Sequence, residues 1–502
     1  MPPPGTSTFH RARTASIIAL GSAIALAGCD SLGQWAKNGL KVGPNYVEPD
    51  AAISGGWIDA NDVRLVSTEP TEREWWKVFN DPVLDELVVA ASQQNLSLRE
   101  AGFRVLEARA ILGIAVGEFF PQQQGAEGGF TRSTVSDKQF GDLPIPFPKR
   151  TFDNWSLGFG LSWEIDFWGR FRRAIEAAEA ELEASVDEYD DVLVTMLGDV
   201  ATRYIQIRTI EARLATARAN IALQKETLAI AQAKFDGGDV SELDVDQATS
   251  TLARTEAQVP QLEIERRIAG DSLCVLLGIP TTSLSERLGK GGIPTAPTSV
   301  AVGIPADLLR RRPDVRRQER LAAAECAKIG IAESDFYPAI SLGGSIGVSA
   351  EQFSDLFTSG SGTGSIGPSF QWKLFDYGRT ASNVRLKKAA FEAAVASYEQ
   401  SVLKANAEAE SGIVRFLQSQ QRVMHLRVAV AAAQQSAAIA LLQYKEGMVD
   451  FNRVSLLEQD LLETEDLEAD ARGEIARGLV DTYRALGGGW QAWLGEPVQT
   501  TP

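Results

Sequence analysis

Alternating hydrophobic and polar residues mark two short segments of the chain. Between positions 156 and 167 every odd position holds Leu, Phe, Trp or Ile, and every even position holds Ser, Gly, Glu or Asp. Positions 365 to 374 repeat the alternation. Because successive side chains of a strand point to opposite faces, each segment is predicted to be a strand with one apolar and one polar face. That pattern is typical of membrane β-barrel strands, although a soluble antiparallel sheet with one buried face shows it too.

A weaker strand pattern precedes each of these segments. It follows Phe119-Phe120-Pro121 in the first case and Phe336-Tyr337-Pro338 in the second. The sequence therefore predicts two β-hairpins, at about 122–167 and 339–375. Four strands cannot close a barrel, because the two edge strands would leave backbone polar groups unpaired in hydrocarbon. A barrel would need several copies of the chain.

Long segments with an apolar residue at every seventh position follow the two hairpins. These segments run from position 186 to 235 and from 395 to 444, and they superpose without a gap at an offset of 209 residues. Gly169-Arg170 and Gly378-Arg379 precede them at the same offset. A seven-residue period predicts helices that coil around neighbours, and the shared offset predicts an internal duplication. A helix over 171–235 would be roughly 100 Å long, which exceeds a compact domain.

Glycine-containing turns at 236–239 and 445–450 end the long segments, and shorter helices are expected to return over 241–277 and 451–486. Pro260 is expected to bend or end the first of them. Helices over 83–118 and 305–334 are expected to lead into the hairpins. The predicted order is helix, strand, strand, long helix, turn and return helix, performed twice.

The N-terminus has the features of an export signal. Arg11 and Arg13 precede a short apolar run that ends in Leu26-Ala27-Gly28-Cys29. Small residues directly before a cysteine resemble a bacterial lipobox, so Cys29 is the expected site of lipid attachment; a cleaved signal with a chance cysteine is the alternative. Asp30 resembles an inner-membrane retention signal, and its effect on sorting stays open.

Charge and composition argue against several classes of partner and functional site. The net charge of −17, from 66 acidic and 49 basic residues, argues against a nucleic-acid partner. His10 lies in the export signal and His425 stands alone, so no catalytic triad or histidine metal site can be assembled, and no cofactor is expected beyond the covalent lipid. Cys274 and Cys326 are expected to be small buried residues, with a disulfide left open.

Two further groups of charged residues have structural interpretations. Glu164 and Asp166 lie near the end of a predicted strand, where we expect them to line its polar face rather than act as acid and base. The arginines at 310–312 are expected to form ion pairs on a helix surface.

Motifs along nearly the whole chain resemble the TolC-like outer-membrane efflux family, in its OprM/NodT lipoprotein branch. The matching residues are Leu26-Ala27-Gly28-Cys29; Val42-Gly43-Pro44-Asn45-Tyr46 with Pro49; Trp75-Trp76, Phe79, Asp81-Pro82, Leu84 and Leu87; Glu164, Asp166, Phe167, Gly169 and Arg170; and Ile304-Pro305 with Leu308-Leu309-Arg310-Arg311-Arg312-Pro313-Asp314-Val315. Each motif is weak alone, whereas their order and spacing together are specific.

The resemblance implies a mainly α fold with a membrane β-barrel. Three copies would form one twelve-stranded pore in outer-membrane lipid and a tunnel of twelve helices. It also implies a passive exit duct without enzymatic activity, joined through a periplasmic adaptor protein to an inner-membrane pump, commonly of the resistance-nodulation-division type. The expected plan is a lipoprotein signal peptide at 1–28, a lipid-anchored extended segment at 29–80, efflux repeats at 81–290 and 300–490, and a tail at 491–502.

By the same resemblance, the two helical turns form the gate and the adaptor contact. The candidates for these roles are Gly237, Gly238, Asp239, Val240, Ser241, Leu243, Gly447, Val449, Asp450, Phe451, Val454, Leu456 and Glu458. Family members place a gating aspartate in the second return helix, where this chain has Leu456. Asp450, Glu458 or Asp460 could replace it, or Leu456 could form an apolar constriction. A solvated helix face is an equally good interpretation of Glu458 and Asp460.

Other classes of protein remain as alternatives. The chain could serve type I protein secretion instead of efflux, or be a structural coiled-coil protein anchored by lipid alone. An enzyme with a coiled-coil insert is disfavoured, because no catalytic cluster is visible in the sequence.

Overall fold

The computed structural model of the chain describes residues 32–66, 73–136 and 151–493. The expected signal segment, Cys29, Asp30 and most of the expected tail lie outside these ranges. The chain divides into two compact units, and each contains segments from both halves of the sequence. The first comprises Met1–Glu48, Ala108–Leu182 and Leu321–Ala394; the second comprises Pro49–Glu107, Glu183–Arg320 and Val395–Pro502.

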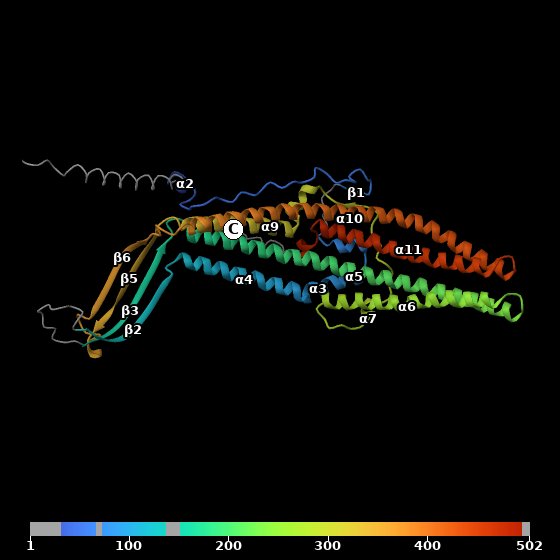
Figure 1. Cartoon of the computed structure of the whole chain (residues 1–502), viewed down its shortest axis with the longest axis horizontal. Coiled ribbons are helices and arrows are strands. Elements are labelled where there is room, and N and C mark those ends of the chain that lie inside the picture. Colours follow the sequence, from blue (N-terminus) through green and yellow to red (C-terminus); the bar gives the residue numbers. More distant parts are fainter. Residues whose placement is uncertain (1–31, 67–72, 137–150, 494–502) are drawn as a thin grey trace, which may run out of the picture. The chain divides into compact units, whose positions relative to one another are not determined.

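Four antiparallel strands in the first unit form one sheet (Figure 1). In sequence order, which is also their order in the sheet, the strands are β2 (Gln123–Thr134), β3 (Thr151–Ile165), β5 (Ala339–Ala350) and β6 (Gly362–Gln371). Both predicted hairpins are therefore present, and β3 pairs with β5 to join them. Strands β2 and β6 form the two edges.

The second hairpin ends earlier than the sequence analysis predicted. Its last pair joins Ala339 to Gln371, so Trp372 and Leu374 lie beyond the strand. The preceding residue on the partner strand is Pro338, which has no backbone N–H to continue the ladder. Trp372 instead donates its indole N–H to the carbonyl oxygen of Phe336, at 3.0 Å.

The helices occur in pairs of equal length. The long helices α5 (Arg170–Asp236) and α10 (Arg379–Lys445) each contain 67 residues, and the return helices α6 (Glu242–Leu276) and α11 (Phe451–Ala485) each contain 35. The remaining elements are α2 (Leu32–Lys37), β1 (Leu65–Val66), η1 (Trp75–Phe79), α3 (Pro82–Gln94), α4 (Leu96–Phe119), α7 (Ser285–Leu288), β4 (Val300–Ala301), η2 (Pro305–Asp307), α8 (Leu308–Arg311), α9 (Pro313–Ser334), η3 (Phe353–Asp355) and η4 (Trp490–Trp493).

Two predicted helices are interrupted in the structure. The helix expected over 305–334 is broken at Arg312, between α8 and α9. The helix expected over 83–118 is split into α3 and α4 at Asn95, whose backbone is extended and whose side-chain oxygen accepts a hydrogen bond from the Leu98 N–H. Conversely, α6 continues through Pro260. Pro260 is exposed, so its ring faces solvent, and the loss of one backbone hydrogen bond does not end a helix with many others. Within the described ranges, no helix combines the length and the apolar character that a membrane crossing requires.

The largest hydrophobic cluster of the second unit gathers around α5. Trp75, Trp76 and Leu84 pack there, each at most 1% exposed, and Trp75 stacks on Tyr483 of α11 with ring centroids 5.7 Å apart. Trp75 and Trp76 belong to the segment 29–80, which the sequence analysis expected to be extended. Buried tryptophans in η1 fix this segment to the helices.

Glycines bring α11 unusually close to α10. A Cβ atom at Gly412 would lie 2.9 Å from the Thr482 backbone nitrogen, and one at Gly478 would lie 2.9 Å from the Phe416 backbone nitrogen. The two helices therefore approach backbone to backbone at reciprocal positions. Only residues without a side chain fit there.

Gly412→Ala is expected to lower the thermal midpoint of the assembled protein, because overpacking a tight contact costs about 1–3 kcal/mol. Gly270→Ala is the matched control. Gly270 lies inside α6, where an added Cβ atom would meet no other atom within 4 Å, and alanine favours a helix over glycine by about 0.5–1 kcal/mol. Circular dichroism at 222 nm, a wavelength that reports helix, gives both midpoints. Equal midpoints for the two variants would contradict the close approach.

Candidate functional site

The sheet of the first unit has one apolar and one polar face. Directly paired residues share a face, and Leu157 pairs with Val348 while Phe159 pairs with Ile346. The intervening positions pair serine and glycine, for example Ser156 with Ser349. The apolar side chains are exposed: Ile346 by 70%, Ile366 by 81% and Phe370 by 75%. This sheet therefore presents an uncovered apolar surface.

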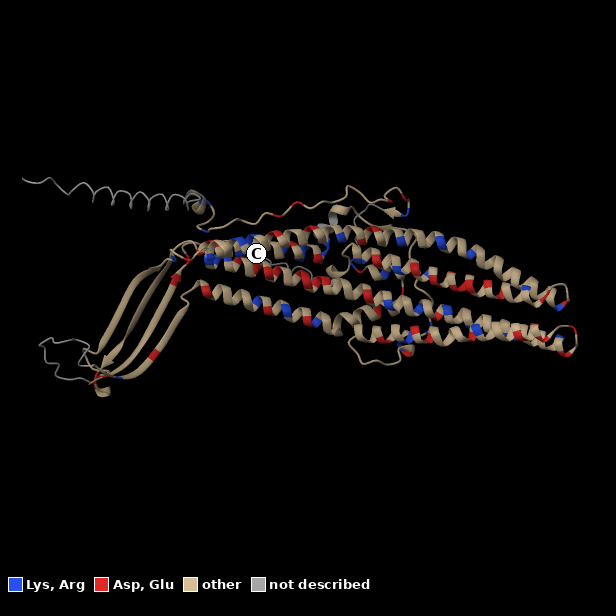
Figure 2. Cartoon of the chain, viewed as in Figure 1, with Lys and Arg blue, Asp and Glu red and all other residues tan. Residues whose placement is uncertain are grey.

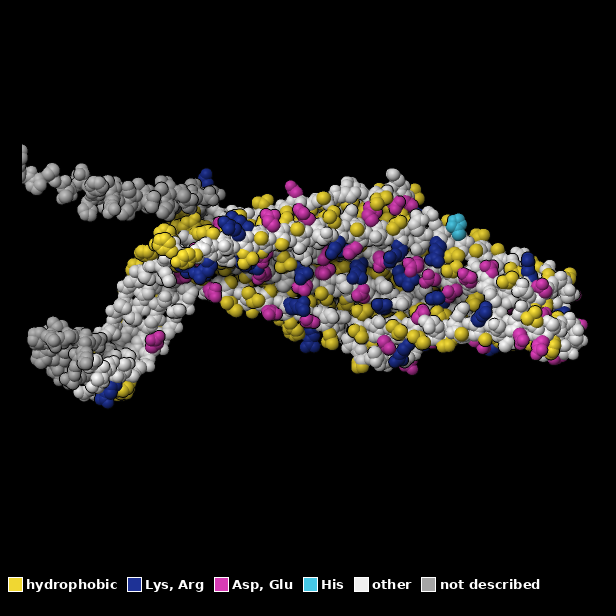
Figure 3. Space-filling view, viewed as in Figure 1, with side chains coloured by type: hydrophobic (Ala, Val, Ile, Leu, Met, Phe, Trp, Pro, Cys, Tyr) yellow, Lys and Arg dark blue, Asp and Glu magenta, His cyan; other side chains and the backbone are white. Residues whose placement is uncertain are grey.

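Charge is nearly absent from these strands. Strands β5 and β6 contain no Asp, Glu, Lys or Arg, whereas charged side chains are frequent on the helices (Figure 2). Exposed apolar residues continue beyond β6 at Trp372, Leu374, Phe375 and Tyr377. Figure 3 shows hydrophobic side chains gathered where the strands join the helices. An apolar surface with aromatic residues at its border suits a lipid environment.

The glycine-arginine pairs lie at the starts of the long helices. Gly169 and Gly378 have backbone φ angles of 83° and 84°, in the left-handed region, and α5 and α10 begin at Arg170 and Arg379. The Arg170 guanidinium lies 3.8 Å from Glu164 and 3.6 Å from Asp335. These glycines allow the chain to turn sharply from strand into helix.

Asp166 does not line the polar face of the strand, contrary to the sequence prediction. Strand β3 ends at Ile165, and the Asp166 side chain, only 4% exposed, accepts hydrogen bonds from the backbone N–H groups of Phe171 and Arg172, both at 3.1 Å. The first N–H groups of a helix have no intrahelical partner, and their end carries positive potential, which explains the carboxylate there. Asp166 is a helix-capping residue.

The extended arm that follows the expected lipid site is bound to the first unit. Arg172 donates to the carbonyl oxygens of Gly39 and Leu40, and Arg173 donates to those of Val42 and Gly43. A Cβ atom at Gly43, whose φ is 82°, would lie 2.5 Å from the Gly330 Cα. Cys29 itself lies outside the described residues. The motif that the sequence analysis singled out around Val42 therefore fixes the arm to α5 and α9.

The predicted turn glycines lie in the turns that join the helix pairs. Gly238 and Gly447 have φ angles of 83° and 76°, and their backbone N–H groups donate to the carbonyl oxygens of Phe235 and Tyr444. Asp450 caps α11 by accepting from the Arg453 N–H at 3.0 Å. The other predicted residues of the first turn are exposed except Val240, which is half-buried; these residues are Gly237, Asp239, Ser241 and Leu243.

One hydrophobic cluster, here called the tip cluster, joins the ends of the two helix pairs. Its buried members are Ala231, Ala248, Ala440, Leu441, Tyr444, Phe451 and Val454, with Val240 and Val449 packed against them. Tyr444 and Phe451 make an edge-to-face contact at 5.4 Å, and the Tyr444 hydroxyl donates to Asp244 at 3.2 Å. Burial, followed by the charge of Asp244, raises the pKa of Tyr444 to about 12. The gate candidates Phe451 and Val454 are thus core residues of the tip.

The remaining candidates on α11 divide by exposure. Leu456 is 56% exposed and Asp460 is exposed, whereas Glu458 is only 2% exposed. Glu458 accepts a hydrogen bond from the Thr227 hydroxyl at 2.6 Å, and burial raises its pKa. The interpretation of Glu458 as part of a solvated helix face was wrong, because that part of α11 packs against α5.

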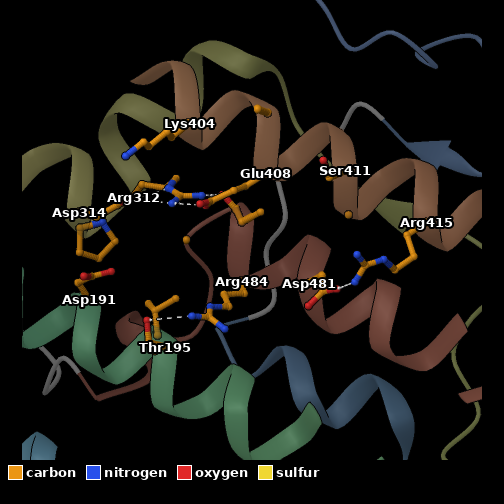
Figure 4. A pocket seen from close by; sticks show the side chains of 16 residues that line it. Asp191, Thr195, Arg312, Asp314, Lys404, Glu408, Ser411, Arg415, Asp481 and Arg484 are labelled. Carbon is orange, nitrogen blue, oxygen red and sulfur yellow. Dashed lines mark hydrogen bonds and ion pairs between the residues drawn. The ribbon is translucent and has the colours of Figure 1, made fainter. Parts of the chain in front are cut away.

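Charged side chains of the second unit line a cavity of about 570 Å³, bordered by α5, α9, α10 and α11 (Figure 4). Arg312 is buried there and donates to the Ala485 carbonyl oxygen, to Asp314 and to Glu408, so the prediction of a surface ion pair was wrong for this residue. Arg415 pairs with Asp481. Sequence reasoning missed the cavity because its residues come from four distant segments.

The cavity is lined by four cationic and four carboxylic side chains. Its cations and carboxylates largely neutralise one another, and burial, followed by the charge of Asp314, raises the pKa of Asp191 to about 6. Across the part of the chain that the structure describes, no group of three or more His, Cys, Asp or Glu side chains could hold a metal ion. Cys274 and Cys326 are both buried free thiols.

Phe451→Ala is expected to loosen the tip, because removing a buried aromatic side chain costs about 3–5 kcal/mol. Leu456→Ala is the matched control on the same helix; its side chain is exposed, so the expected change is within about 0.5 kcal/mol. The measurement is the rate of trypsin cleavage after Lys445, at the end of α10. Faster cleavage in Phe451→Ala alone supports the tip cluster, and equal rates in both variants would refute it.

Known proteins share this architecture. The family model for outer membrane efflux proteins matches residues 87–279 and 304–488. Nodulation protein T of Rhizobium leguminosarum bv. trifolii is 32% identical over 451 residues, which cover 88% of this chain and 91% of that protein. The toluene efflux pump outer membrane protein TtgF of Pseudomonas putida is 28% identical, covering 96% of this chain and 98% of that protein.

Solved structures agree with these matches. The outer-membrane channel OprN is 34% identical to this chain and superposes with a TM-score of 0.83, covering 90% of this chain and 99% of its own. Together with the uncovered apolar sheet and the 67-residue helices, these matches show that the chain belongs to the outer membrane efflux protein family, in its TolC-like OprM/NodT group.

Proposed function

We propose that the protein is the outer-membrane exit duct of a tripartite efflux system. It would passively conduct small molecules that an inner-membrane pump and a periplasmic adaptor deliver. The observation that supports this role best is the family match over both halves of the chain, 87–279 and 304–488. A sheet with one apolar and one polar face, attached to long helices, has the parts that such a duct needs.

The duct would be a homotrimer. The described residues leave β2 and β6 as sheet edges, and edges are too costly to expose to hydrocarbon. Three copies of the four-stranded sheet would close one twelve-stranded barrel, and their helices would form a common tunnel. The equal lengths of α5 and α10, and of α6 and α11, support an origin of the chain by internal duplication.

Lipid attached to Cys29 would anchor the protein in the outer membrane. Arg172 and Arg173 bind the arm from Gly39 to Gly43, which follows Cys29 closely in sequence. The anchor would therefore be held beside the first unit, which contains the apolar sheet. We propose that the protein reaches the outer membrane even though Asp30 resembles an inner-membrane retention signal.

The two helix turns, closed by the tip cluster, would contact the adaptor and form the gate. The pump would be of the resistance-nodulation-division type, and it would select the substrates that the duct conducts. Relatives of the chain are named for toluene, solvent and pyoverdine export, so compounds of these classes are the first to test. The duct would perform no chemistry.

Deleting the gene is expected to increase susceptibility to at least one class of compound in a panel of solvents, drugs and metal ions, because an exit duct limits efflux through its pump. A plasmid copy should restore resistance, and the purified protein should carry its adaptor after mild cross-linking. Unchanged susceptibility to every compound, together with no bound adaptor, would contradict the efflux role.

Leu456→Asp is expected to change the single-channel conductance in planar bilayers. In a trimer, the substitution would create a ring of three carboxylates near the axis, which favours cations. Val428→Asp, which alters a 72% exposed residue of α10 outside the turn, is the control. Identical conductance in Leu456→Asp and in the unmodified protein would show that this position lies away from the constriction.

A further inference from the structure

Polar side chains join α5 to α11 just beyond the tip cluster, beside an apolar cluster that includes Leu223 of α5 and Leu461 of α11. Thr227 donates to Glu458 at 2.6 Å, and the Asn220 amide donates to Glu465 at 2.7 Å. From α6, Thr251 shares a hydrogen bond of 2.8 Å with Ser455 of α11. We call these residues, together with Gln224 of α5, the polar seam.

The polar seam is buried but incompletely hydrogen-bonded. Gln224 is 2% exposed and Thr227 is 1% exposed. Both polar atoms of the Gln224 amide lack a hydrogen-bond partner among the described residues. Buried polar groups without partners reduce stability, so packing here is weaker than a fully paired or apolar contact would be.

Glu458 and Glu465 are the two carboxylic acids of the polar seam, and Glu458 is the fully buried one. An ionised carboxylate accepts several hydrogen bonds, yet the Thr227 hydroxyl is the one donor that the described residues supply. Burial raises the pKa of Glu458, and the hydrogen bond from Thr227 opposes this only in part. The carboxyl group is therefore better suited to this position when it is neutral.

Charged groups on the neighbouring helices do not neutralise Glu458. On α5, Lys225 pairs with Glu256 of α6 at 2.9 Å, and Glu226 pairs with Lys445 of α10 at 3.3 Å. On α11 itself, Asp460 is exposed. Glu465 accepts from the amides of Asn220 and of Gln434 on α10, and Arg213 of α5 pairs with Asp466 of α11.

We propose that Glu458 is a proton-controlled latch, which holds α11 against α5 when its carboxyl group is neutral and weakens that contact when it ionises. The latch would act on the tip of the proposed duct, so this inference rests on the proposed function. Its direction follows from proton linkage. A carboxyl group whose pKa is higher in the packed state binds its proton more tightly there, so the stability of packing falls as pH rises above the ordinary value of 4.5 toward the raised pKa.

Glu458→Gln tests the latch, because glutamine has nearly the same shape and stays neutral. The thermal midpoint of the assembled full-length protein would be measured in detergent at about pH 5 and about pH 8. The midpoint of Glu458→Gln should exceed that of the wild type by a larger margin at the higher pH. Asp460→Asn, which neutralises an exposed carboxylate two residues away, should follow the wild type at both pH values. An equal margin at both pH values for Glu458→Gln would overturn the proposal.

A second variant tests the same contact from α5. Thr227→Val removes the donor that favours the ionised form, so its midpoint should fall more steeply with pH than that of the wild type. Conductance in planar bilayers separates failure of the latch from failure of the duct. Channels that open more often at about pH 8 in the wild type but not in Glu458→Gln support the latch. If channel opening depends on pH in the same way in the wild type and in Glu458→Gln, the latch is refuted but the duct is not. If neither protein conducts, the duct is refuted.

Discussion

Backbone hydrogen bonding at the edges of the four-stranded sheet constrains this protein more than any single side chain does. Each inner strand satisfies its N–H and C=O groups against two neighbours, whereas β2 and β6 have one neighbour each within the described chain. The exposed apolar face, with Ile366 and Phe370, is suited to lipid, where unpaired backbone groups have no water to bind. We propose that strands of other copies of the chain pair with β2 and β6 in that environment.

The helices pack through different kinds of contact along their length. Around η1 and α3, buried tryptophans and leucines stabilise the second unit, while Gly412 and Gly478 let α10 and α11 approach without intervening side chains. Toward the turns, the apolar tip cluster is followed by the polar seam with its buried Glu458. The end of the protein that is proposed to open is thus joined partly by polar contacts, which are easier to separate than a continuous apolar core.

The sequence predicted those features that depend on periodicity. Alternation located β3 and β6, the seven-residue period located α5 and α10, and glycines located the turns. The sequence did not predict features that depend on a single side-chain contact or on which face of a helix packs against a neighbour. Asn95 interrupts the helix expected over 83–118 through its own side-chain hydrogen bond. The burial of Glu458 depends on which face of α11 meets α5, which the residues of α11 alone do not specify.

The central claim is that several copies of the chain complete one barrel, and the mass of the purified assembly tests it most directly. Native mass spectrometry of the full-length protein released from detergent should give the mass of three chains. The same species should persist on dilution. Dissociation would leave the backbone N–H and C=O groups at the edges of β2 and β6 unpaired in every copy. A single chain that remains folded and monodisperse in detergent would contradict the account.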